Sequence, residues 1–309
     1  MLFLNRRGYA GFIACRSCGY VAKCPHCDVS LSIHRGGKLV CHYCGHEEEE
    51  YAVCPTCGSK HIGGFRAGTQ QIEELVKAEF PEARVLRMDM DTTKAKDGHE
   101  KILEQFANEE ADILIGTQMI VKGHDFPNVT LVGVLAADMS LYTNDYRAGE
   151  RTFQLLTQAA GRAGRGCEKG EVVIQTYSPE HYAIETAGEQ DYETFYEEEI
   201  EYRRLMGYPP VEQLMAILVS CEEEELLNTA CKYLKSYAER VNREQAIIIG
   251  PTSPYVGKVQ DVYRKMIYIK HADYQVLIEM KNKLEQYIEM NCGFQKVRIQ
   301  FDFNPMNLF

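Results

Sequence analysis

The sequence predicts an α/β protein with a parallel sheet that carries an inserted cysteine-rich module and is followed by a smaller α+β domain. Three observations lead to this fold class. Short apolar runs alternate with helical patterns from residue 62 to residue 176, which is typical of a parallel sheet. Eight cysteines in four Cys-x2-Cys pairs lie between residues 15 and 57. After Pro209-Pro210 the expected order is strand, helix, strand, strand, helix, strand.

Length and composition fit a soluble protein of two or three domains. The chain has 309 residues, of which 45% are hydrophobic. No stretch approaches the roughly 18 apolar residues of a membrane span, and the apolar run at the amino terminus is too short for a secretory signal. We therefore expect a cytoplasmic protein with no membrane partner.

The net charge of -11 argues at first against a nucleic-acid partner, because phosphate contacts come from clustered lysines and arginines. The acidic residues, however, concentrate in Glu47–Glu50 and in a run from Glu189 to Glu201, where they most simply form solvated faces. Basic residues gather elsewhere, including Arg6-Arg7. This uneven distribution keeps nucleic acid open as a partner.

The chain opens with a predicted buried strand, Leu2-Phe3-Leu4, which ends in the polar and basic turn Asn5-Arg6-Arg7-Gly8. Two arginines after a strand are often plain surface, and they also suit a phosphate contact. Both interpretations stay open at this point.

The four cysteine pairs predict two zinc sites. Zinc takes four thiolates in a tetrahedron with bonds of about 2.3 Å, and a two-residue spacer lets one tight turn present two sulfurs. The residues between Cys27 and Cys41 alternate and turn like a β-hairpin, so the ends of this hairpin must meet. This pairing places Cys24, Cys27, Cys41 and Cys44 on one ion and leaves Cys15, Cys18, Cys54 and Cys57 for the other.

Disulfides or a redox dithiol are the alternatives to zinc, and a reducing compartment disfavours both. Histidines could replace a cysteine, but eight thiolates already fill two tetrahedra, so four histidines are not expected to be ligands: His26, His34, His42 and His46. With no open coordination position, both ions are expected to be structural.

The parallel sheet is expected to include the strands that follow the cysteines: Ile62–Phe65, Ala83–Met88, Asp112–Gly116, Val129–Ala136 and Glu171–Thr176. Helices are expected from Thr69, over Gly98–Phe106 and over Tyr146–Arg165. In open sheets of this class, ligands bind at the carboxyl ends of the strands.

Thr69 follows Gly68 and is a natural N-cap for its helix. The same helix amino terminus could bind a nucleic-acid phosphate, although plain capping is the simpler role. Asp89 and Asp91 follow a strand, but no partner carboxylate is evident, so a solvated loop is favoured over a metal site.

Two segments carry most of the functional information. The first, from Asp112 to Pro127, begins with the buried-strand signal Asp112–Gly116 and continues from Thr117 to Pro127. The second is a helix that ends in Gln158-Ala-Ala-Gly-Arg162-Ala-Gly-Arg165. Two arginines at a glycine-rich helix end can aim at one anionic centre, because glycine releases the backbone and guanidinium groups bind phosphate bidentately. The alternative is a solvated helix terminus that is capped by basic side chains.

Both segments resemble motifs V and VI of superfamily 2 helicases, and they are similar to those of the PriA family of primosomal replication-restart helicases. The resemblance implies that Thr117 contacts the nucleic-acid backbone and that Gly123 and Asp125 bind the nucleotide, Asp125 at the ribose. It also places the Asn5-Arg6-Arg7 turn where motif IV contacts the phosphates of the bound strand. Thr69, through the amino terminus of its helix, is a further candidate nucleic-acid contact.

For the second segment, the resemblance implies that Gln158 is the polar opening residue of the ATP-binding motif. It implies that Arg162 and Arg165 reach the γ-phosphate of ATP as catalytic arginine fingers. The expected fold of this part is a RecA-like helicase lobe 2.

The same resemblance implies a domain organisation. Residues 1–14 and 58–180 form lobe 2, residues 15–57 the zinc-binding insertion, residues 181–210 a helical linker, and residues 211–309 a ferredoxin-like α+β domain that binds DNA. In this family the insertion helps to engage branched DNA and partner proteins, and the carboxyl-terminal end takes part in binding the single-stranded-DNA-binding protein.

Two expectations concern surfaces in the last third of the chain. The acidic helical stretch from His181 to Tyr208 is expected to carry an apolar stripe of Tyr192, Phe195, Tyr196, Ile200 and Leu205. A basic patch of modest size, as readily a solvated surface as a site, is expected from Lys258, Arg264, Lys265 and Lys270.

An ATP-driven helicase also needs a phosphate loop of the Gly-x4-Gly-Lys-Ser/Thr kind and an acidic strand end that holds magnesium. The sequence contains neither. If the resemblance holds, the chain is a carboxyl-terminal fragment that is inactive alone, and ATP and Mg²⁺ are bound only in the intact enzyme. The implied partners are branched and single-stranded DNA, the single-stranded-DNA-binding protein and other primosome proteins.

The competing function is a non-enzymatic zinc-ribbon protein that binds nucleic acid without a nucleotide. It explains the cysteines and the missing phosphate loop, but it gives no reason for Thr117, Asp125, Arg162 and Arg165 at helicase spacing. A dinucleotide-binding enzyme is disfavoured, because the glycines after residue 160 lie at a helix end and in reversed spacing.

Overall fold

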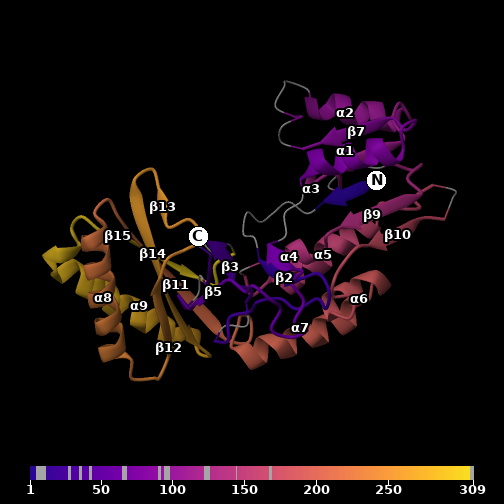
Figure 1. Cartoon of the computed structure of the whole chain (residues 1–309). Coiled ribbons are helices and arrows are strands. Elements are labelled where there is room, and N and C mark those ends of the chain that lie inside the picture. Colours follow the sequence, from indigo (N-terminus) through magenta and orange to yellow (C-terminus); the bar gives the residue numbers. More distant parts are fainter. Residues whose placement is uncertain are drawn as a thin grey trace. The chain divides into compact units, whose positions relative to one another are not determined.

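The structure is a computed structural model that describes residues 1–4, 12–26, 29–34, 37–41, 44–64, 68–89, 92–93, 98–121, 126–143, 145–166 and 169–306. The chain divides into two compact units (Figure 1). The first holds residues 1–21, 51–143 and 147–197, and the second holds residues 22–50, 144–146 and 198–309. The cysteine-rich segment therefore contributes to both units, and the expected domain boundaries stay a prediction.

The first unit is built on a five-stranded parallel sheet, which confirms the α/β fold. In pairing order its strands are β10 (Glu171–Ile174), β9 (Leu131–Leu135), β1 (Leu2–Leu4), β8 (Ile113–Gly116) and β7 (Val85–Met88). The central strand β1 comes from the start of the chain, and its Phe3 and Leu4 are fully buried. Such apolar runs are typical of parallel strands, which are covered on both faces.

Seven helices of this part of the chain are described: α1 (Thr69–Glu79), α2 (Gly98–Ala107), α3 (Gln118–Val121), α4 (Asp138–Leu141), α5 (Ala148–Ala160), α6 (Tyr182–Glu189) and α7 (Tyr192–Met206). Helix α7 runs from the first unit into the second. Among the described residues, no helix is both long and apolar enough to cross a membrane.

Helix α5 forms because its apolar residues recur at helical spacing. Phe153, Leu156 and Ala159 lie on its buried face and belong to the same core as β9. The ring of Phe153 stacks on that of Phe195, with centroids 4.1 Å apart. The helix begins at Ala148 and ends at Ala160, so the residues up to Arg165 form a turn and not the helix end that was predicted.

One expected strand belongs to a different sheet. Ile62–Gly64 forms β6, which pairs antiparallel with β2 (Ile13–Cys15) in a two-stranded sheet. Its inclusion in the parallel sheet was wrong. Cys15 is the last residue of β2, and its sulfur atom converges with those of Cys54 and Cys57, which precede β6 in the chain.

The second unit contains the expected hairpin of the cysteine-rich segment. Strands β3 (Ser32–His34), β4 (Lys38–Val40) and β5 (Glu47–Glu49) form an antiparallel sheet, which confirms that the ends of the hairpin meet. A Cβ atom on Gly45 would lie 3.4 Å from the Thr252 hydroxyl oxygen. The cysteine turn at Gly45 therefore packs against the sheet that the rest of this unit builds.

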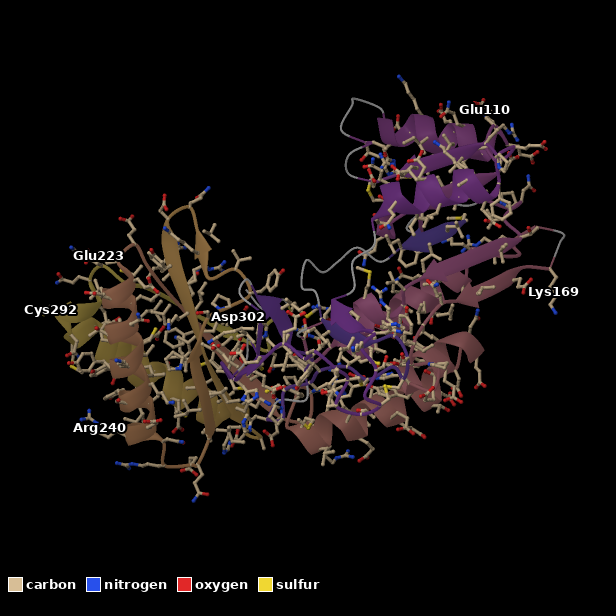
Figure 2. All side chains as sticks on the ribbon, in the orientation of Figure 1. Glu110, Lys169, Glu223, Arg240, Cys292 and Asp302 are labelled. Atoms are coloured by element: carbon tan, nitrogen blue, oxygen red, sulfur yellow. The ribbon has the colours of Figure 1, made fainter. Side chains whose placement is uncertain are left out.

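That sheet confirms the predicted order of elements after Pro210. Its strands pair antiparallel in the order β12 (Ile247–Thr252), β14 (Val262–His271), β11 (Gln213–Cys221) and β15 (Arg298–Phe303), and β13 (Lys258–Val259) forms a hairpin with β14. Helices α8 (Glu224–Val241) and α9 (Tyr274–Met290) cover it, and the 3-10 helix η1 (Cys292–Phe294) follows α9. Glu223 and Arg240 mark the two ends of α8 (Figure 2).

The predicted apolar stripe between residues 181 and 208 was right only for Phe195, which is buried, and Ile200, which is half-buried. The stretch forms two helices, because Gln190 takes a left-handed conformation with φ of 58° and ends α6. Of the stripe, Phe195 is buried, whereas Tyr192 and Tyr196 are exposed and Leu205 is 84% exposed. The inner face of the last turns of α7 uses Glu199 and Arg203 instead.

Two tyrosines and two cations form a buried stack in the second unit. The rings of Tyr146 and Tyr208 are nearly parallel, with centroids 4.7 Å apart. The Arg203 guanidinium lies 5.4 Å from the Tyr146 centroid, and the Lys270 ammonium lies 3.7 Å from the Tyr208 centroid. All four side chains are buried, which strengthens cation–π contacts. Lys270 therefore does not belong to the surface patch that was expected.

Replacing Arg203 with methionine should strongly destabilise the second unit. Arg203 pairs with Glu199 at 2.7 Å and donates to the Pro209 carbonyl oxygen at 2.8 Å, and both charged side chains are buried. The variant leaves the Glu199 carboxylate buried without this partner, so the free energy of unfolding should fall by about 3–5 kcal/mol in urea denaturation.

The matched control is Arg204→Met. Arg204 pairs with Glu201 on the same helix, but both side chains are more than half exposed. Its loss should change the free energy of unfolding by about 1 kcal/mol or less. Equal effects of the two variants would contradict the importance of the buried pair.

Candidate functional site

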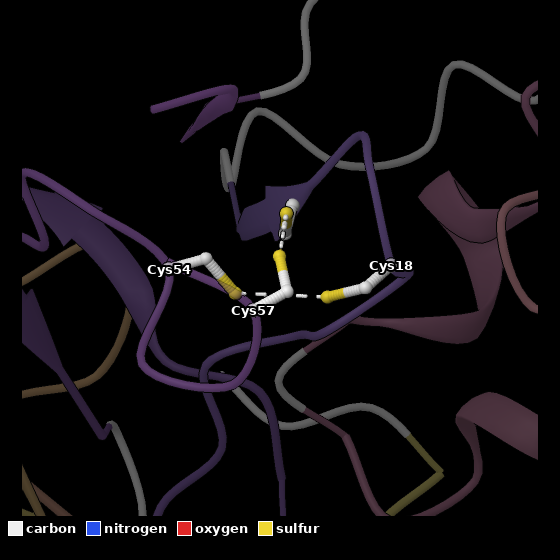
Figure 3. A group of neighbouring side chains, drawn as sticks. Cys18, Cys54 and Cys57 are labelled. Atoms are coloured by element: carbon white, nitrogen blue, oxygen red, sulfur yellow. Dashed lines mark hydrogen bonds between the residues drawn. The ribbon is translucent and has the colours of Figure 1, made fainter. Parts of the chain in front are cut away.

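Four cysteine sulfur atoms converge in the first unit. The sulfur atoms of Cys15 and Cys57 lie 3.6 Å apart, as do those of Cys18 and Cys54, and all four lie within 4.8 Å of one another. The side chains of Cys18, Cys54 and Cys57 point toward one another (Figure 3).

Glycines close the two turns that present these sulfurs. The N–H of Gly19 donates to the Cys15 carbonyl oxygen at 3.0 Å, and that of Gly58 donates to the Cys54 carbonyl oxygen at 2.9 Å. Both glycines have positive φ, 74° and 71°, which side chains rarely tolerate. The local sequence thus folds into two cysteine turns that face each other.

A second cluster lies in the second unit. The sulfur atoms of Cys24, Cys41 and Cys44 are within 4.8 Å of one another, and those of Cys24 and Cys44 are 3.5 Å apart. Cys27, the fourth expected ligand, lies outside the described residues. The described cysteines group as predicted, with those on either side of the β3–β4 hairpin in one cluster, since the hairpin returns the chain to its starting point.

The described sulfur atoms of both clusters are spaced as in a zinc tetrathiolate. In a tetrahedron with bonds of about 2.3 Å, the sulfurs are about 3.8 Å apart, close to the 3.5 and 3.6 Å between the cysteine pairs. In the first cluster Cys15 and Cys54 are buried and Cys18 and Cys57 are exposed. Sulfur ligands alone suit a structural ion.

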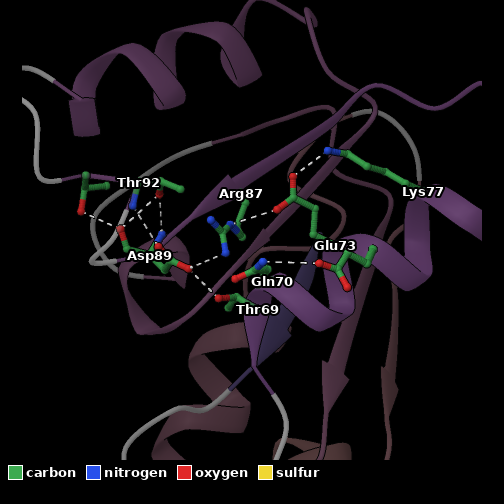
Figure 4. Close-up of polar contacts among 9 residues, drawn as sticks. Thr69, Gln70, Glu73, Lys77, Arg87, Asp89 and Thr92 are labelled. Carbon is green, nitrogen blue, oxygen red and sulfur yellow. Dashed lines mark hydrogen bonds and ion pairs between the residues drawn. The ribbon is translucent and has the colours of Figure 1, made fainter.

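Thr69 is not the N-cap of α1, contrary to the prediction. The N-cap is Gly68, which has no side chain that could cap the helix. The Thr69 hydroxyl donates instead to Asp89 Oδ2 at 2.5 Å (Figure 4). Thr69 is the first helical residue and is 1% exposed, so its side chain lies in the interior of the protein.

Asp89 does not lie in a solvated loop, so that expectation was also wrong. The residue is 1% exposed, and its carboxylate accepts from the Thr92 N–H at 3.0 Å. It also pairs with Arg87 at 3.5 Å, and Arg87 pairs with Glu73 at 3.0 Å (Figure 4). These contacts tie α1 to the end of β7. Asp91 lies outside the described residues.

Thr69, Asp89 and Thr117 lie at the carboxyl edge of the parallel sheet. Asp89 follows Met88, the last residue of β7, and Thr117 follows Gly116, the last residue of β8. Met88 and Gly116 are register partners, so the two strands end side by side. Thr69 reaches this edge through its hydrogen bond to Asp89.

Arg162 and Arg165 lie at the opposite, amino edge. The N–H of Gly164, between them, donates at 2.9 Å to the carbonyl oxygen of Val129, two residues before β9 begins. Gly166 closely approaches the carbonyl oxygen of Pro127, the end of the first functional segment. The ends of both functional segments therefore meet at the amino edge.

The two arginines have different environments. Arg162 is half-buried, whereas Arg165 is exposed and its Nε donates to the Gly161 carbonyl oxygen at 2.7 Å. This hydrogen bond is what the alternative to an arginine finger predicts, namely a basic side chain that caps the end of a helix. Gln158 is exposed on the last turn of α5.

The structure brings Thr69 and Thr117 to one edge of the sheet and places Arg162 and Arg165 at the other. Several predicted site residues lie outside the described residues: Asn5, Arg6, Arg7, Gly123 and Asp125. The general rule that ligands bind at carboxyl ends does not anticipate a second set of polar residues at the amino edge.

Asp138 is a buried carboxylate that the sequence analysis did not select. It begins α4 beyond the carboxyl end of β9, is 4% exposed, and accepts hydrogen bonds from the Thr176 hydroxyl at 3.1 Å and the Tyr177 N–H at 3.0 Å. Burial raises the pKa of Asp138, against these hydrogen bonds, which lower it. The sequence pattern that could have identified Asp138 is an aspartate shortly after an apolar strand, which is also the pattern at Asp89.

The expected basic residues of the last domain do not share one environment. Lys258 pairs with Asp261 at 2.9 Å and lies 4.6 Å from the Tyr263 ring centroid, whereas Lys270 is buried in the tyrosine stack. The two side chains therefore satisfy local contacts instead of forming one open patch.

Three family models match the chain. One described as the PriA DNA helicase Cys-rich region matches residues 24–48, the helicase conserved C-terminal domain matches residues 55–167, and the primosomal protein N C-terminal domain matches residues 204–306. The second of these covers β7, β8 and β9 and both functional segments, so the five-stranded sheet has the fold of a helicase lobe 2.

Curated relatives are similar along the whole chain. The replication restart protein PriA of Bacillus subtilis is 46% identical over 306 residues, which is 99% of this chain and 38% of the relative. The PriA proteins of Synechocystis and Borreliella burgdorferi are 39% and 34% identical, cover 100% of this chain, and are themselves covered to 37% and 46%. The chain thus spans less than half the length of these relatives.

Proposed function

We propose a function from the premise that this chain belongs to the PriA DNA helicase family. The chain completes the ATP site of an ATP-dependent replication restart helicase, and it binds one strand of the DNA. The observation that carries the proposal is the division of polar side chains between the two edges of one parallel sheet. Thr69 and Thr117 stand at the carboxyl edge, and Arg162 and Arg165 stand at the amino edge. One rigid lobe can thereby hold DNA at one edge and nucleotide at the other.

At the amino edge, Arg162 and Arg165 bring positive charge to the phosphates of ATP. When bound, ATP would supply the transferable phosphoryl group, and Mg²⁺ would offset part of its negative charge. Arg165 is exposed and makes a neutral contact with the Gly161 carbonyl oxygen, which it can exchange for a charge-assisted bond to a phosphate oxygen. Gln158, Gly123 and Asp125 complete the nucleotide contacts.

The rest of the ATP site must come from another polypeptide segment. The sequence has no Gly-x4-Gly-Lys-Ser/Thr loop to cradle phosphates. Arginines alone offer charge but neither a phosphate cradle nor a magnesium ligand. The chain by itself should therefore not hydrolyse ATP.

At the carboxyl edge, Thr117 and the Asn5-Arg6-Arg7 turn contact the phosphates of one DNA strand. The Thr69 hydroxyl already donates to Asp89, so its helix contributes the N–H groups of the first turn instead. Closing and opening of the nucleotide cleft would move these contacts along the strand.

Two zinc ions are proposed as structural elements, on Cys15, Cys18, Cys54 and Cys57 and on Cys24, Cys27, Cys41 and Cys44. Support comes from the sulfur spacing and from the match to a PriA Cys-rich region. The βαββαβ order and the strand order β12-β14-β11-β15 support a ferredoxin-like carboxyl-terminal domain that binds DNA. Branched and single-stranded DNA, the single-stranded-DNA-binding protein and primosome proteins are the proposed partners, in the cytoplasm.

Restoring the missing lobe tests the proposal. A polypeptide that carries the phosphate loop of a PriA relative is mixed with this chain, and ATP hydrolysis is measured with and without DNA. We expect hydrolysis only when both polypeptides and DNA are present. If the chain binds DNA but the mixture stays inactive, the non-enzymatic zinc-ribbon function is favoured. Substantial hydrolysis by the chain alone would contradict the incomplete site.

A further inference from the structure

We propose that Tyr146 is a positioning residue for the arginine end of helix α5, and that a stack of aromatic and cationic side chains in the second unit holds it in place. The inference rests on the proposed function, because it concerns the turnover of ATP by Arg162 and Arg165. It gives the carboxyl-terminal part of the chain a role in ATP hydrolysis that is separate from its proposed binding of DNA.

The first observation is the path of the chain before α5. Tyr142 is buried in the core of the first unit. Residues 144–146 belong to the second unit, and the chain is again part of the first unit from Arg147, which is the N-cap of α5. The position of Tyr146 therefore fixes the point from which the chain enters this helix.

The second observation is how the second unit holds Tyr146. The residue is 3% exposed, and its ring stacks on that of Tyr208, with centroids 4.7 Å apart and planes that differ by 10°. The Arg203 guanidinium lies 5.4 Å from the centroid of the Tyr146 ring. Aromatic stacking and buried cation–π contacts are directional, so they fix the orientation of the ring as well as its place.

The third observation is that the stack is anchored to the sheet of the second unit. Lys270 lies on β14, an inner strand that pairs with both β11 and β12. Its ammonium lies 3.7 Å from the Tyr208 centroid and donates to the Met206 carbonyl oxygen at 3.2 Å. The N–H of Tyr208 donates to the Arg203 carbonyl oxygen at 2.8 Å. The Tyr146 ring therefore stacks on a partner that is held by an inner strand and by the end of α7.

The fourth observation is that α5 joins this stack to the two arginines. The helix runs from Ala148 to Ala160, and the turn with Arg162 and Arg165 follows directly. A helix of 13 residues is about 20 Å long and moves largely as a rigid rod. Beyond it, the N–H of Gly164 donates to the Val129 carbonyl oxygen. The arginine turn is therefore placed by β9 on one side and by the start of α5 on the other.

Loss of the Tyr146 ring should release the start of α5. The helix could then slide or rotate on its core, and the guanidinium groups after it would be displaced from the phosphates. A catalytic group that is misplaced by about 1 Å can lower turnover by about 10²-fold. A partial displacement should therefore give a smaller loss than removal of an arginine.

A rival explanation is that Tyr146 only stabilises the second unit. The same unit has a comparable stack that allows a direct comparison. The rings of Tyr237 and Tyr287 have centroids 4.0 Å apart and planes that differ by 9°, and the Arg240 guanidinium lies 5.0 Å from the Tyr237 centroid. This stack joins α8 to α9, which do not adjoin α5 in the sequence. Only the first explanation predicts different turnover when the two stacks are broken.

The test uses a protein that combines this chain with the missing helicase lobe. Tyr146→Leu keeps an apolar side chain and removes the ring, and Tyr237→Leu is the matched control in the second stack. Tyr146→Phe keeps the ring and is the conservative variant. DNA-dependent ATP hydrolysis over a range of ATP concentrations gives kcat and KM, and circular dichroism gives the Tm of each variant.

We expect Tyr146→Leu to lower kcat about tenfold at a temperature where the variant is folded. KM for ATP should stay within a factor of about two, because the arginines act mainly on the transition state. Tyr146→Phe should keep at least about half of the kcat, since stacking needs only the ring. Tyr237→Leu should lower Tm and leave kcat within a factor of about two.

An unchanged kcat in Tyr146→Leu, or equal losses of kcat in Tyr146→Leu and Tyr237→Leu, overturns the inference. If Tyr146→Leu does not fold, Lys270→Met weakens the same stack from the far side of Tyr208. That variant should lower kcat about threefold, and an unchanged kcat overturns the inference. If the unmodified protein does not hydrolyse ATP, the proposed function fails, and the inference fails with it.

Discussion

Replacing Arg165 with alanine should reduce DNA-dependent ATP turnover by about 10³-fold in a protein that combines this chain with the missing helicase lobe. That factor corresponds to about 4 kcal/mol of lost transition-state stabilisation. Arg165 stands at the amino edge and is exposed, and its Nε donates to the Gly161 carbonyl oxygen. Loss of its charge should leave nothing at that position to meet the developing charge on the phosphate.

The control for this experiment is Arg151→Ala. Arg151 is exposed near the beginning of α5, the helix that ends just before the Arg162–Arg165 turn, and it lies far in sequence from that glycine-rich turn. Its replacement should leave turnover within a factor of about two, since surface substitutions have small effects. If Arg165→Ala lowers only thermal stability and leaves turnover intact, Arg165 is a helix cap and not an arginine finger.

Replacing Cys54 with serine should lower the zinc content of the chain from two ions to one. Structural zinc contributes about 10–16 kcal/mol of binding free energy in small zinc-finger peptides, so its loss should release the elements that it holds. The first cluster adjoins β2 and β6, whose pairing is limited to three residues each. Hydrogen exchange should therefore show lost protection at Ile13–Cys15 and Ile62–Gly64.

The second cluster should survive this substitution, because its cysteines belong to the other compact unit. Protection of the β3–β4 hairpin should persist in Cys54→Ser and be lost in Cys41→Ser. Cys292→Ser is the matched control, since Cys292 is exposed and lies outside both clusters, and it should retain both ions. Zinc contents near one or zero in the unmodified chain would contradict two sites.

The sequence alone was sufficient where the physical cause is local. The cysteine grouping could be predicted because Ser32–His34 and Lys38–Val40 form a hairpin, and a hairpin returns the chain to its starting point. The parallel sheet could be predicted because buried strands carry continuous apolar runs between amphipathic helices. The end of β8 and the glycine-rich stretch that stops α5 could be located approximately, because both interrupt a regular pattern, but the short helix α3 after β8 was not predicted.

Only the tertiary structure decided which distant residues meet. The Thr69 hydroxyl donates to Asp89, twenty positions along the chain, and does not cap its own helix. Burial favours a hydrogen bond that satisfies both the hydroxyl and the carboxylate. Glu199 and Arg203 can lie on the inner face of α7 because Arg203 contacts the Tyr146 ring and the Pro209 carbonyl oxygen there. The division of Thr117 and Arg165 between two edges follows from strand order and register. These depend on pairing between segments that are far apart in the chain, and local periodicity does not encode that pairing.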